Sequence, residues 1–239
     1  MMIISTTGIV LTKFRYKDTS LIVKVITRDT GLCSFIVRVG KGKKKKNIFN
    51  YFQPLSIIEI EYDSNNKRDL HFFKEVDLKI NFKSIHSNHK KSVVIIFLSE
   101  ILSKTLKFQG KDLQLYDFIE ASLTYFDESE FTPYFHLIFL IKLTRYLGFY
   151  PDTNNNQYTS FDLEQGFYSD SEIGGYLLKE KELESFNDIL GTNFDASNEL
   201  TLSSMQRTKL LDNILLYYKL HIENFGSIKS LDVLRKIFE

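Results

Sequence analysis

Partial alternation of apolar and polar residues marks the first 80 positions of the chain. Several short runs there are rich in β-branched residues, a pattern typical of half-buried strands. The pattern predicts five strands, at residues 7–14, 20–27, 32–39, 55–62 and 70–76. A turn at 28–31 contains Gly31, which accepts a positive φ at little cost, so residues 20–39 are expected to form a hairpin.

Five short strands in about 80 residues, with a long connection between the third and the fourth, suit a small closed barrel such as an OB-fold. Beyond residue 80 the hydrophobic period changes towards 3.6, which predicts helices. They are expected at 92–108, 112–126, 132–148, from 171 towards 189, at 203–218 and at 227–238. The predicted fold class is therefore α+β and multidomain: a five-stranded OB-fold barrel at residues 1–80 and an all-α domain at 81–239, with an irregular polar segment at 150–170.

The net charge of +1 hides a strong asymmetry between these two parts. Residues 1–80 contain 15 Lys and Arg against 8 Asp and Glu, a net charge of +7, whereas the remainder carries −6. A basic module suits phosphate backbones, because each cation that neutralises a phosphate releases counterions. The densest cluster lies at residues 38–46, where glycines and like charges predict a solvent-exposed loop.

These cations are the candidate DNA-binding residues. They are Lys13, Arg15, Lys24, Arg28, Arg38, Lys41, Lys43, Lys44, Lys45 and Lys46. Aromatic rings that could stack on unpaired bases accompany them, namely Phe14, Tyr16, Phe49, Tyr51 and Phe52. Two alternatives stay open: the rings fill the barrel core, and the lysine run is merely solvated. Lysines contact phosphates as point charges, so binding is expected to be weakly sequence-specific and sensitive to salt.

Signals for catalysis, metal binding and membrane insertion are weak. The single cysteine, Cys33, cannot build a thiolate zinc site alone, and His86 and His89 lack the spacing of a metal motif. No Walker-type loop or paired carboxylates stand out, so no catalytic residue, metal or cofactor is assigned, and an enzyme, such as a hydrolase with an unrecognised site, is the less favoured alternative. The start is not a signal peptide, and the apolar stretch 93–98 is too short to span a bilayer, so the cytoplasm is expected.

Several segments, taken in order, resemble the RecO family of bacterial DNA-repair proteins. They are residues 7–11, 16–23 and 27–32, the basic loop at 38–46, Gln-Pro at 53–54, and segments 147–151, 217–221 and 231–234. Many members of that family carry a four-cysteine zinc site after the segment that corresponds to 147–151. This sequence has no cysteine there, so the zinc is expected to be absent and local packing to replace it.

The resemblance implies a mediator of RecF-pathway recombination that binds single- and double-stranded DNA and anneals strands. It also implies loading of RecA onto strands coated with the single-stranded-DNA-binding protein SSB, together with RecR and, in some members, RecF. A member is expected in the bacterial cytoplasm with the nucleoid. The family binds the acidic tail of SSB on its helical domain, for which the candidates here are Lys104, Lys107, Lys142 and Arg145. The alternative function is an RNA-binding OB-fold module of a ribosome-associated or RNA-processing protein.

Overall fold

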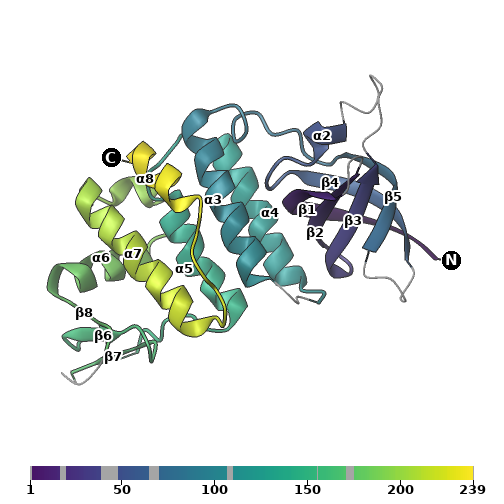
Figure 1. Cartoon of the computed structure of the whole chain (residues 1–239). Helices are drawn as coiled ribbons and strands as arrows, with labels where there is room; N and C mark the ends of the chain where they lie inside the picture. The colour runs from purple at the N-terminus through teal and green to yellow at the C-terminus, as the bar shows by residue number, and fades with distance from the viewer. Residues whose placement is uncertain are drawn as a thin grey trace. The chain divides into compact units, whose positions relative to one another are not determined.

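A computed structural model describes residues 2–16, 20–38, 48–64, 70–106, 110–154, 156–170 and 175–238. The chain divides into two compact units. Unit 1 comprises Met1–Glu130 with Ile228–Leu231, and unit 2 comprises Phe131–Ser227 with Asp232–Glu239. The N-terminal strands and the first two long helices belong to unit 1 (Figure 1).

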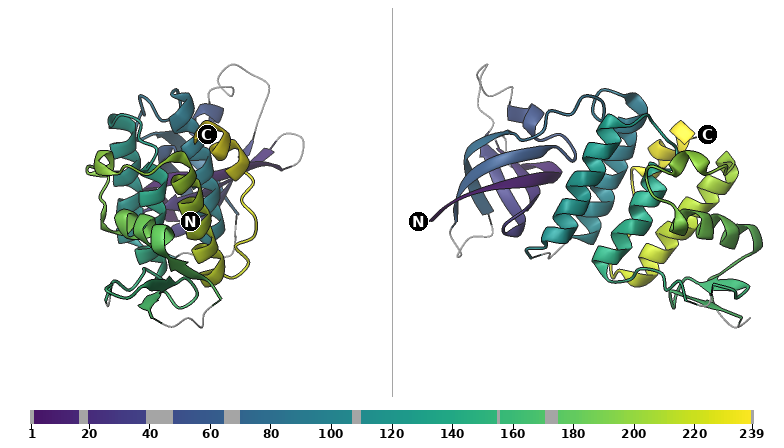
Figure 2. Two further views of the ribbon diagram at one scale, coloured as in Figure 1. Left: turned by 90° about the vertical axis from the view of Figure 1, so that its left-hand side faces the viewer. Right: turned by 180° about the vertical axis from the view of Figure 1, so that it is seen from behind.

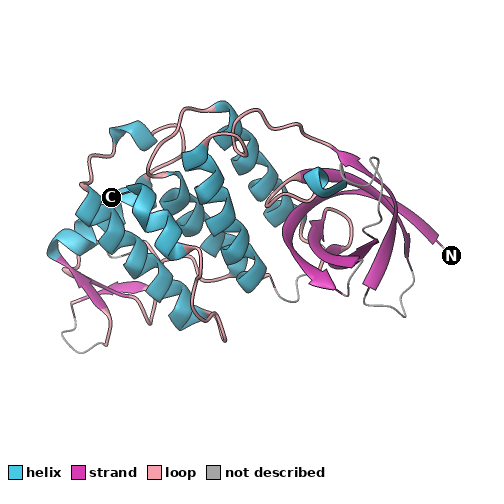
Figure 3. Cartoon of the chain, turned by 45° about the horizontal axis from the view of Figure 1, so that its top comes forward, coloured by secondary structure: helices cyan, strands magenta, loops and turns pink. Residues whose placement is uncertain are grey.

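Five strands of unit 1 close into a barrel (Figure 3). They are β1 (Met2–Tyr16), β2 (Ser20–Thr27), β3 (Gly31–Arg38), β4 (Ile57–Ser64) and β5 (Leu70–Leu78), and a short helix, α2 (Ile48–Tyr51), precedes β4. The order around the barrel is β1-β2-β3-β5-β4, with β3 and β5 parallel and the other pairs antiparallel. The predicted OB-fold barrel is thereby confirmed.

The long first strand serves two partners. Residues of β1 as far as Ile9 pair with β4, and residues from Gly8 onward pair with β2. A register shift between Val10 and Thr12 interrupts the ladder with β2, and such bulges bend a strand. Past Ile9, β1 therefore pairs with β2 alone among the described strands and extends beyond the closed part of the barrel.

The barrel core is aliphatic around a cluster of rings. Phe35 stacks on Phe73 with ring centroids 4.2 Å apart and meets Tyr62 edge-on at 5.1 Å. Phe52 is fully buried in this core, and Phe49 and Tyr51 are partly buried against it. These contacts favour the core interpretation for the three rings, most fully for Phe52.

Two helices of unit 1 lie side by side next to the barrel, α3 (His89–Thr105) and α4 (Leu113–Glu128) (Figure 2). Asn88 caps α3 and Asp112 caps α4 through their side-chain oxygens. The Ser99 hydroxyl donates to the Leu11 carbonyl, and the Tyr116 hydroxyl donates to Thr7 Oγ1 at 3.0 Å. Polar contacts thus fix both helices to β1.

Unit 2 is mainly helical. Its elements are α5 (Phe135–Leu147), β6 (Ser160–Asp162), β7 (Phe167–Ser169), β8 (Leu177–Lys179), α6 (Glu180–Gly191), the 3₁₀ turn η1 (Ser197–Glu199), α7 (Ser204–His221) and α8 (Leu231–Phe238), whose first residue is assigned to unit 1. Gly148, with φ +84°, ends α5, and a capping box at Ser203 starts α7.

A small sheet, in the order β7-β6-β8, occupies the segment that the sequence suggested would be irregular or helical. The helix expected from residue 171 begins only at Glu180, and residues 177–179 form β8 instead. Phe161 pairs with Tyr168 on one side and Leu178 on the other, and its ring lies 4.9 Å from that of Phe186. Strands of three residues are too short to show an alternating pattern, so they are not recognisable in the sequence.

Candidate nucleic-acid interface

An apolar row crosses four strands on the outer face of the barrel. The register pairs Phe14 of β1 with Ile22 of β2, Ile22 with Ile36 of β3, and Ile36 with Phe72 of β5. Directly paired residues point to the same face of a sheet. Phe14 is 45% exposed and Phe72 44%, while the two isoleucines are half-buried. We call these four residues the apolar row.

Cations flank this row on the same face. Lys24 follows Ile22 by two residues on β2, so it lies next to the row on the same face, where it pairs with Thr12 and Ser34. Arg38 lies one step to the other side, and its guanidinium sits 5.9 Å from the centroid of the Phe72 ring, within the range of a cation–π contact. Exposed rings beside cations are the chemistry that holds unpaired bases and their phosphates.

Lys13 and Arg15 project from the opposite face of β1. They pair with Val23 and Leu21 of β2, whose side chains are buried in the barrel core. Because β1 continues past the closed part of the barrel, both cations remain largely exposed. The end of β1 therefore carries Phe14 and Tyr16 on one face and two cations on the other.

Arg28 is separated from these residues, in the turn between β2 and β3. Its guanidinium lies 2.6 Å from Asp117 and 3.6 Å from Glu120 of α4, and 5.5 Å from the centroid of the Tyr116 ring. Lys79 also pairs with Glu120. Arg28 thus links the barrel to α4, although the sequence predicts it as a DNA-binding residue together with the other cations.

The densest basic segment lies outside the described residues. This segment contains Lys41, Lys43, Lys44, Lys45 and Lys46. Lys107, elsewhere in the chain, is also outside the described residues. In sequence, this segment starts directly after the end of β3 at Arg38. Its role in binding DNA therefore stays a prediction.

The remaining candidates for the SSB tail belong to different units. Lys104 is on α3 in unit 1, whereas Lys142 and Arg145 are on α5 in unit 2. Lys142 Nζ donates to Asn193 Oδ1 at 2.6 Å, and the Arg145 guanidinium lies 4.1 Å from the Tyr150 ring centroid. The leucines named with them, Leu102, Leu106 and Leu143, are fully buried core residues, and only Leu147 is half-exposed.

Phe72, Ile22 and Ile36 of the apolar row are not among the residues that the sequence predicts for the interface. A signal for two of them was available: a hairpin that turns at residues 28–31 places Ile22 opposite Ile36. Phe72 had no such signal, because its neighbour β3 runs parallel to β5 and is distant in sequence. No helix in the described part of the chain is long and apolar enough to cross a membrane.

A closed five-stranded OB-type barrel, carrying an apolar row with flanking cations and followed by a helical part, defines an OB-fold protein with an accessory helical region. The family models "Recombination protein O N terminal" and "Recombination protein O C terminal" match residues 1–82 and 86–232. Together they cover most of the sequence. The chain belongs to the recombination protein O (RecO) family.

Curated relatives agree over the full length. A protein of Flavobacterium psychrophilum named "DNA repair protein RecO" is 40% identical over 98% of this chain and 99% of its own length. Proteins of the same name from Christiangramia forsetii and Phocaeicola vulgatus are 33% and 35% identical, each over 99% of this chain and 100% of its own length.

Proposed function

We propose that this chain is a DNA-binding mediator of recombinational repair in the RecF pathway, without a chemical step of its own. The observation that carries the proposal is the apolar row between Lys24 and Arg38 on an OB-type barrel, in a chain of the RecO family. Unpaired bases stack on the row, and phosphates contact the cations beside it. Double-stranded DNA uses the cations alone, because its bases are paired and covered.

In this proposal the chain anneals complementary strands and helps load RecA onto SSB-coated single strands together with RecR, and with RecF where that protein takes part. Binding both single strands and duplex through non-specific contacts supports annealing, because it brings strands together without reading their sequence. Lys104, Lys107, Lys142 and Arg145 are proposed to attract the acidic SSB tail. Protein in the bacterial cytoplasm, beside the nucleoid, has access to all these partners.

The basic segment provides the principal test of DNA binding. Replacing Lys43, Lys44, Lys45 and Lys46 with Ala should weaken binding to single strands and duplex alike, by a similar factor for every sequence. The slope of log affinity against log salt concentration should become shallower by up to about 3 for single strands, at roughly 0.7 per phosphate contact.

A matched control removes four exposed lysines from unit 2, by replacing Lys179, Lys181, Lys219 and Lys236 with Ala. This control changes the net charge equally and should leave the salt slope nearly unchanged. Equal affinities for wild type and the 43–46 variant at moderate salt would remove the segment from the interface. A clear preference for RNA over matched DNA would favour the RNA-binding alternative.

The partner proposals need their own measurements. An SSB tail peptide should bind the full chain, lose affinity without its terminal Phe, and bind more weakly to the Lys142→Ala and Arg145→Ala variants. Nuclease and ATPase assays on pure protein should both be negative, and activity in either would contradict a non-enzymatic role.

A further inference from the structure

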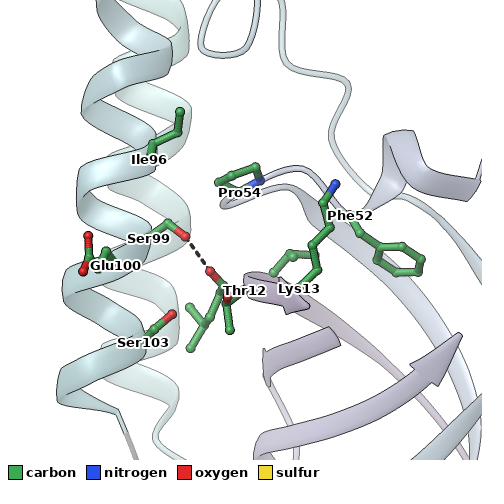
Figure 4. A pocket seen from close by; sticks show the side chains of 10 residues that line it. Thr12, Lys13, Phe52, Pro54, Ile96, Ser99, Glu100 and Ser103 are labelled. Atoms are coloured by element: carbon green, nitrogen blue, oxygen red, sulfur yellow. Dashed lines mark hydrogen bonds between the residues drawn. The ribbon is translucent and has the colours of Figure 1, made fainter. Parts of the chain in front are cut away.

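A cavity of about 340 Å³ lies in unit 1 between the end of β1 and helix α3 (Figure 4). Small-molecule sites in proteins begin at about 300 Å³, so this cavity has room for one nucleotide-sized group. Lys13 and Pro54 line it from the barrel, and Ile96 and Ser103 line it from α3. The cavity is separate from the apolar row, which lies on the opposite face of β1.

One exposed apolar side chain, Ile96, lines the helix side of the cavity beside Ser99, Glu100 and Ser103. Ile96 is 48% exposed although it lies in the middle of α3, where its neighbours Ile95 and Phe97 are fully buried. Pro54 faces it from the barrel. A flat apolar ligand placed between these two side chains would cover both.

Lys13 supplies a positive charge without a counter-ion. No carboxylate among the described residues lies within ion-pair distance of its ammonium, and partial burial lowers the pKa of Lys13. Glu100 also lines the cavity, but its carboxylate accepts hydrogen bonds from the backbone N–H of Lys229 at 2.9 Å and of Ser230 at 2.8 Å. In Figure 4 the Glu100 side chain points away from Lys13 and Pro54, so the charge nearest to Pro54 is the Lys13 ammonium.

We propose that this cavity binds one nucleotide of a bound single strand, with its base between Ile96 and Pro54 and its phosphate on Lys13. The proposal rests on the proposed function and extends the DNA site from the barrel onto α3. Phe14 and Lys13 are adjacent in sequence but lie on opposite faces of β1. At Val10 the second edge of β1 is bonded to the backbone of Leu55 and Ser56, but from Thr12 to Tyr16 it pairs with no described strand, so a single strand leaving the apolar row can pass around that part of the edge.

The expected ligand is a single strand because only an unpaired base can enter the cavity. An acidic peptide with an apolar side chain would also satisfy a cation beside an apolar wall. The nucleotide is favoured because Lys13 of the cavity and Phe14 of the apolar row are adjacent in β1, and because Pro54 closely follows the basic segment in the sequence.

Photocrosslinking on the wild-type chain tests the placement directly. An oligo(dT) that carries one 4-thiothymidine at successive positions should, at one or two of them, crosslink to the α3 peptide that contains Ile96. Crosslinks confined to barrel peptides, from all positions of a bound oligonucleotide, would overturn the proposal.

Two variants test the energetics by fluorescence anisotropy. Ile96→Asp should weaken oligo(dT) binding about tenfold, and Lys13→Gln about threefold, with duplex affinity changed less for Ile96→Asp. The matched controls are Val233→Asp, at an exposed apolar position on α8, and Lys179→Gln. Circular dichroism verifies that each variant is folded.

The outcomes separate the two proposals. Wild-type affinity in both variants, with weakened binding in a Phe72→Ala variant, would overturn the cavity site and leave the proposed function intact. Failure of the wild-type chain to bind oligo(dT) at all would overturn both. If Lys13→Gln loses affinity for an Asp-rich peptide with a terminal Leu, but keeps its affinity for oligo(dT), the cavity is a peptide site instead.

Discussion

Arg28 and Arg38 belong to the same barrel, and the sequence gives no reason to treat them differently. Arg28 lies against two carboxylates of α4, at 2.6 Å from Asp117 and 3.6 Å from Glu120. Arg38 has no ion pair among the described residues and lies over the exposed ring of Phe72. A cation's partners, more than its charge, therefore decide whether it stabilises the fold or is available to a ligand.

Charged residues on the helical side of unit 1 also stabilise the fold, as Arg28 does. Asp127 accepts hydrogen bonds from the backbone N–H groups of Lys83, Ser84 and Ile85 at 2.7–3.0 Å. The buried ammonium of Lys91 donates to the Asp127 and Ser129 carbonyls and to Ser84 Oγ. All three of its protons have acceptors, so this charge belongs entirely to the fold.

The largest expected effect is the loss of this network. Asp127→Ala should lower the free energy of unfolding by about 3 kcal/mol, because three backbone donors lose a charged acceptor and buried Lys91 loses a nearby negative charge. Urea denaturation measures the change. Glu128→Ala, at the exposed neighbouring position, should stay within about 0.5 kcal/mol of wild type. Equal losses in the two variants would show that the network contributes nothing special.

Acid should weaken the same network. Burial alone would raise the pKa of Asp127, but the backbone hydrogen bonds from Lys83, Ser84 and Ile85 outweigh it and hold the pKa below the usual value. A carboxyl with a lowered folded-state pKa adds stability above its unfolded pKa of about 4 and loses it as the pH falls through the folded value. Urea midpoints between pH 6 and 3 should therefore fall more steeply for wild type than for Asp127→Asn. Parallel curves would contradict this assignment.

The second role, binding a ligand, is tested at the apolar row. Phe72→Ala should weaken single-strand binding about tenfold, because stacking contributes roughly 1–3 kcal/mol per base. Its salt slope should stay unchanged, since no cation is removed. Ile3→Ala removes an apolar side chain that is 56% exposed near the start of β1 and serves as the control. A similar loss in both variants would indicate a general effect of exposed apolar area.

The barrel was predictable because its strands are long enough for an alternating pattern and its hairpin turns at Gly31. The site was predictable only in part. Phe14 and Ile22 are visible in the sequence as apolar residues in strands. Only the register of the strands, which the sequence pattern does not specify, shows that they are paired on the same face of the sheet. The engagement of Arg28 depends on Asp117, which lies 89 residues further along the chain, and local patterns carry no information about such contacts.

The smallest expected effect compares the two arginines directly. Arg38→Gln should reduce the salt slope of single-strand binding by about 0.7, the value for one lost phosphate contact, and weaken affinity two- to threefold. Arg28→Gln should leave that slope unchanged and instead lower the free energy of unfolding by about 0.5 kcal/mol, since its ion pairs are partly exposed. Titrations at several salt concentrations and urea denaturation of both variants give the four values needed. If Arg28→Gln reduced the salt slope as much as Arg38→Gln, the carboxylates of α4 would have to release Arg28 when DNA binds.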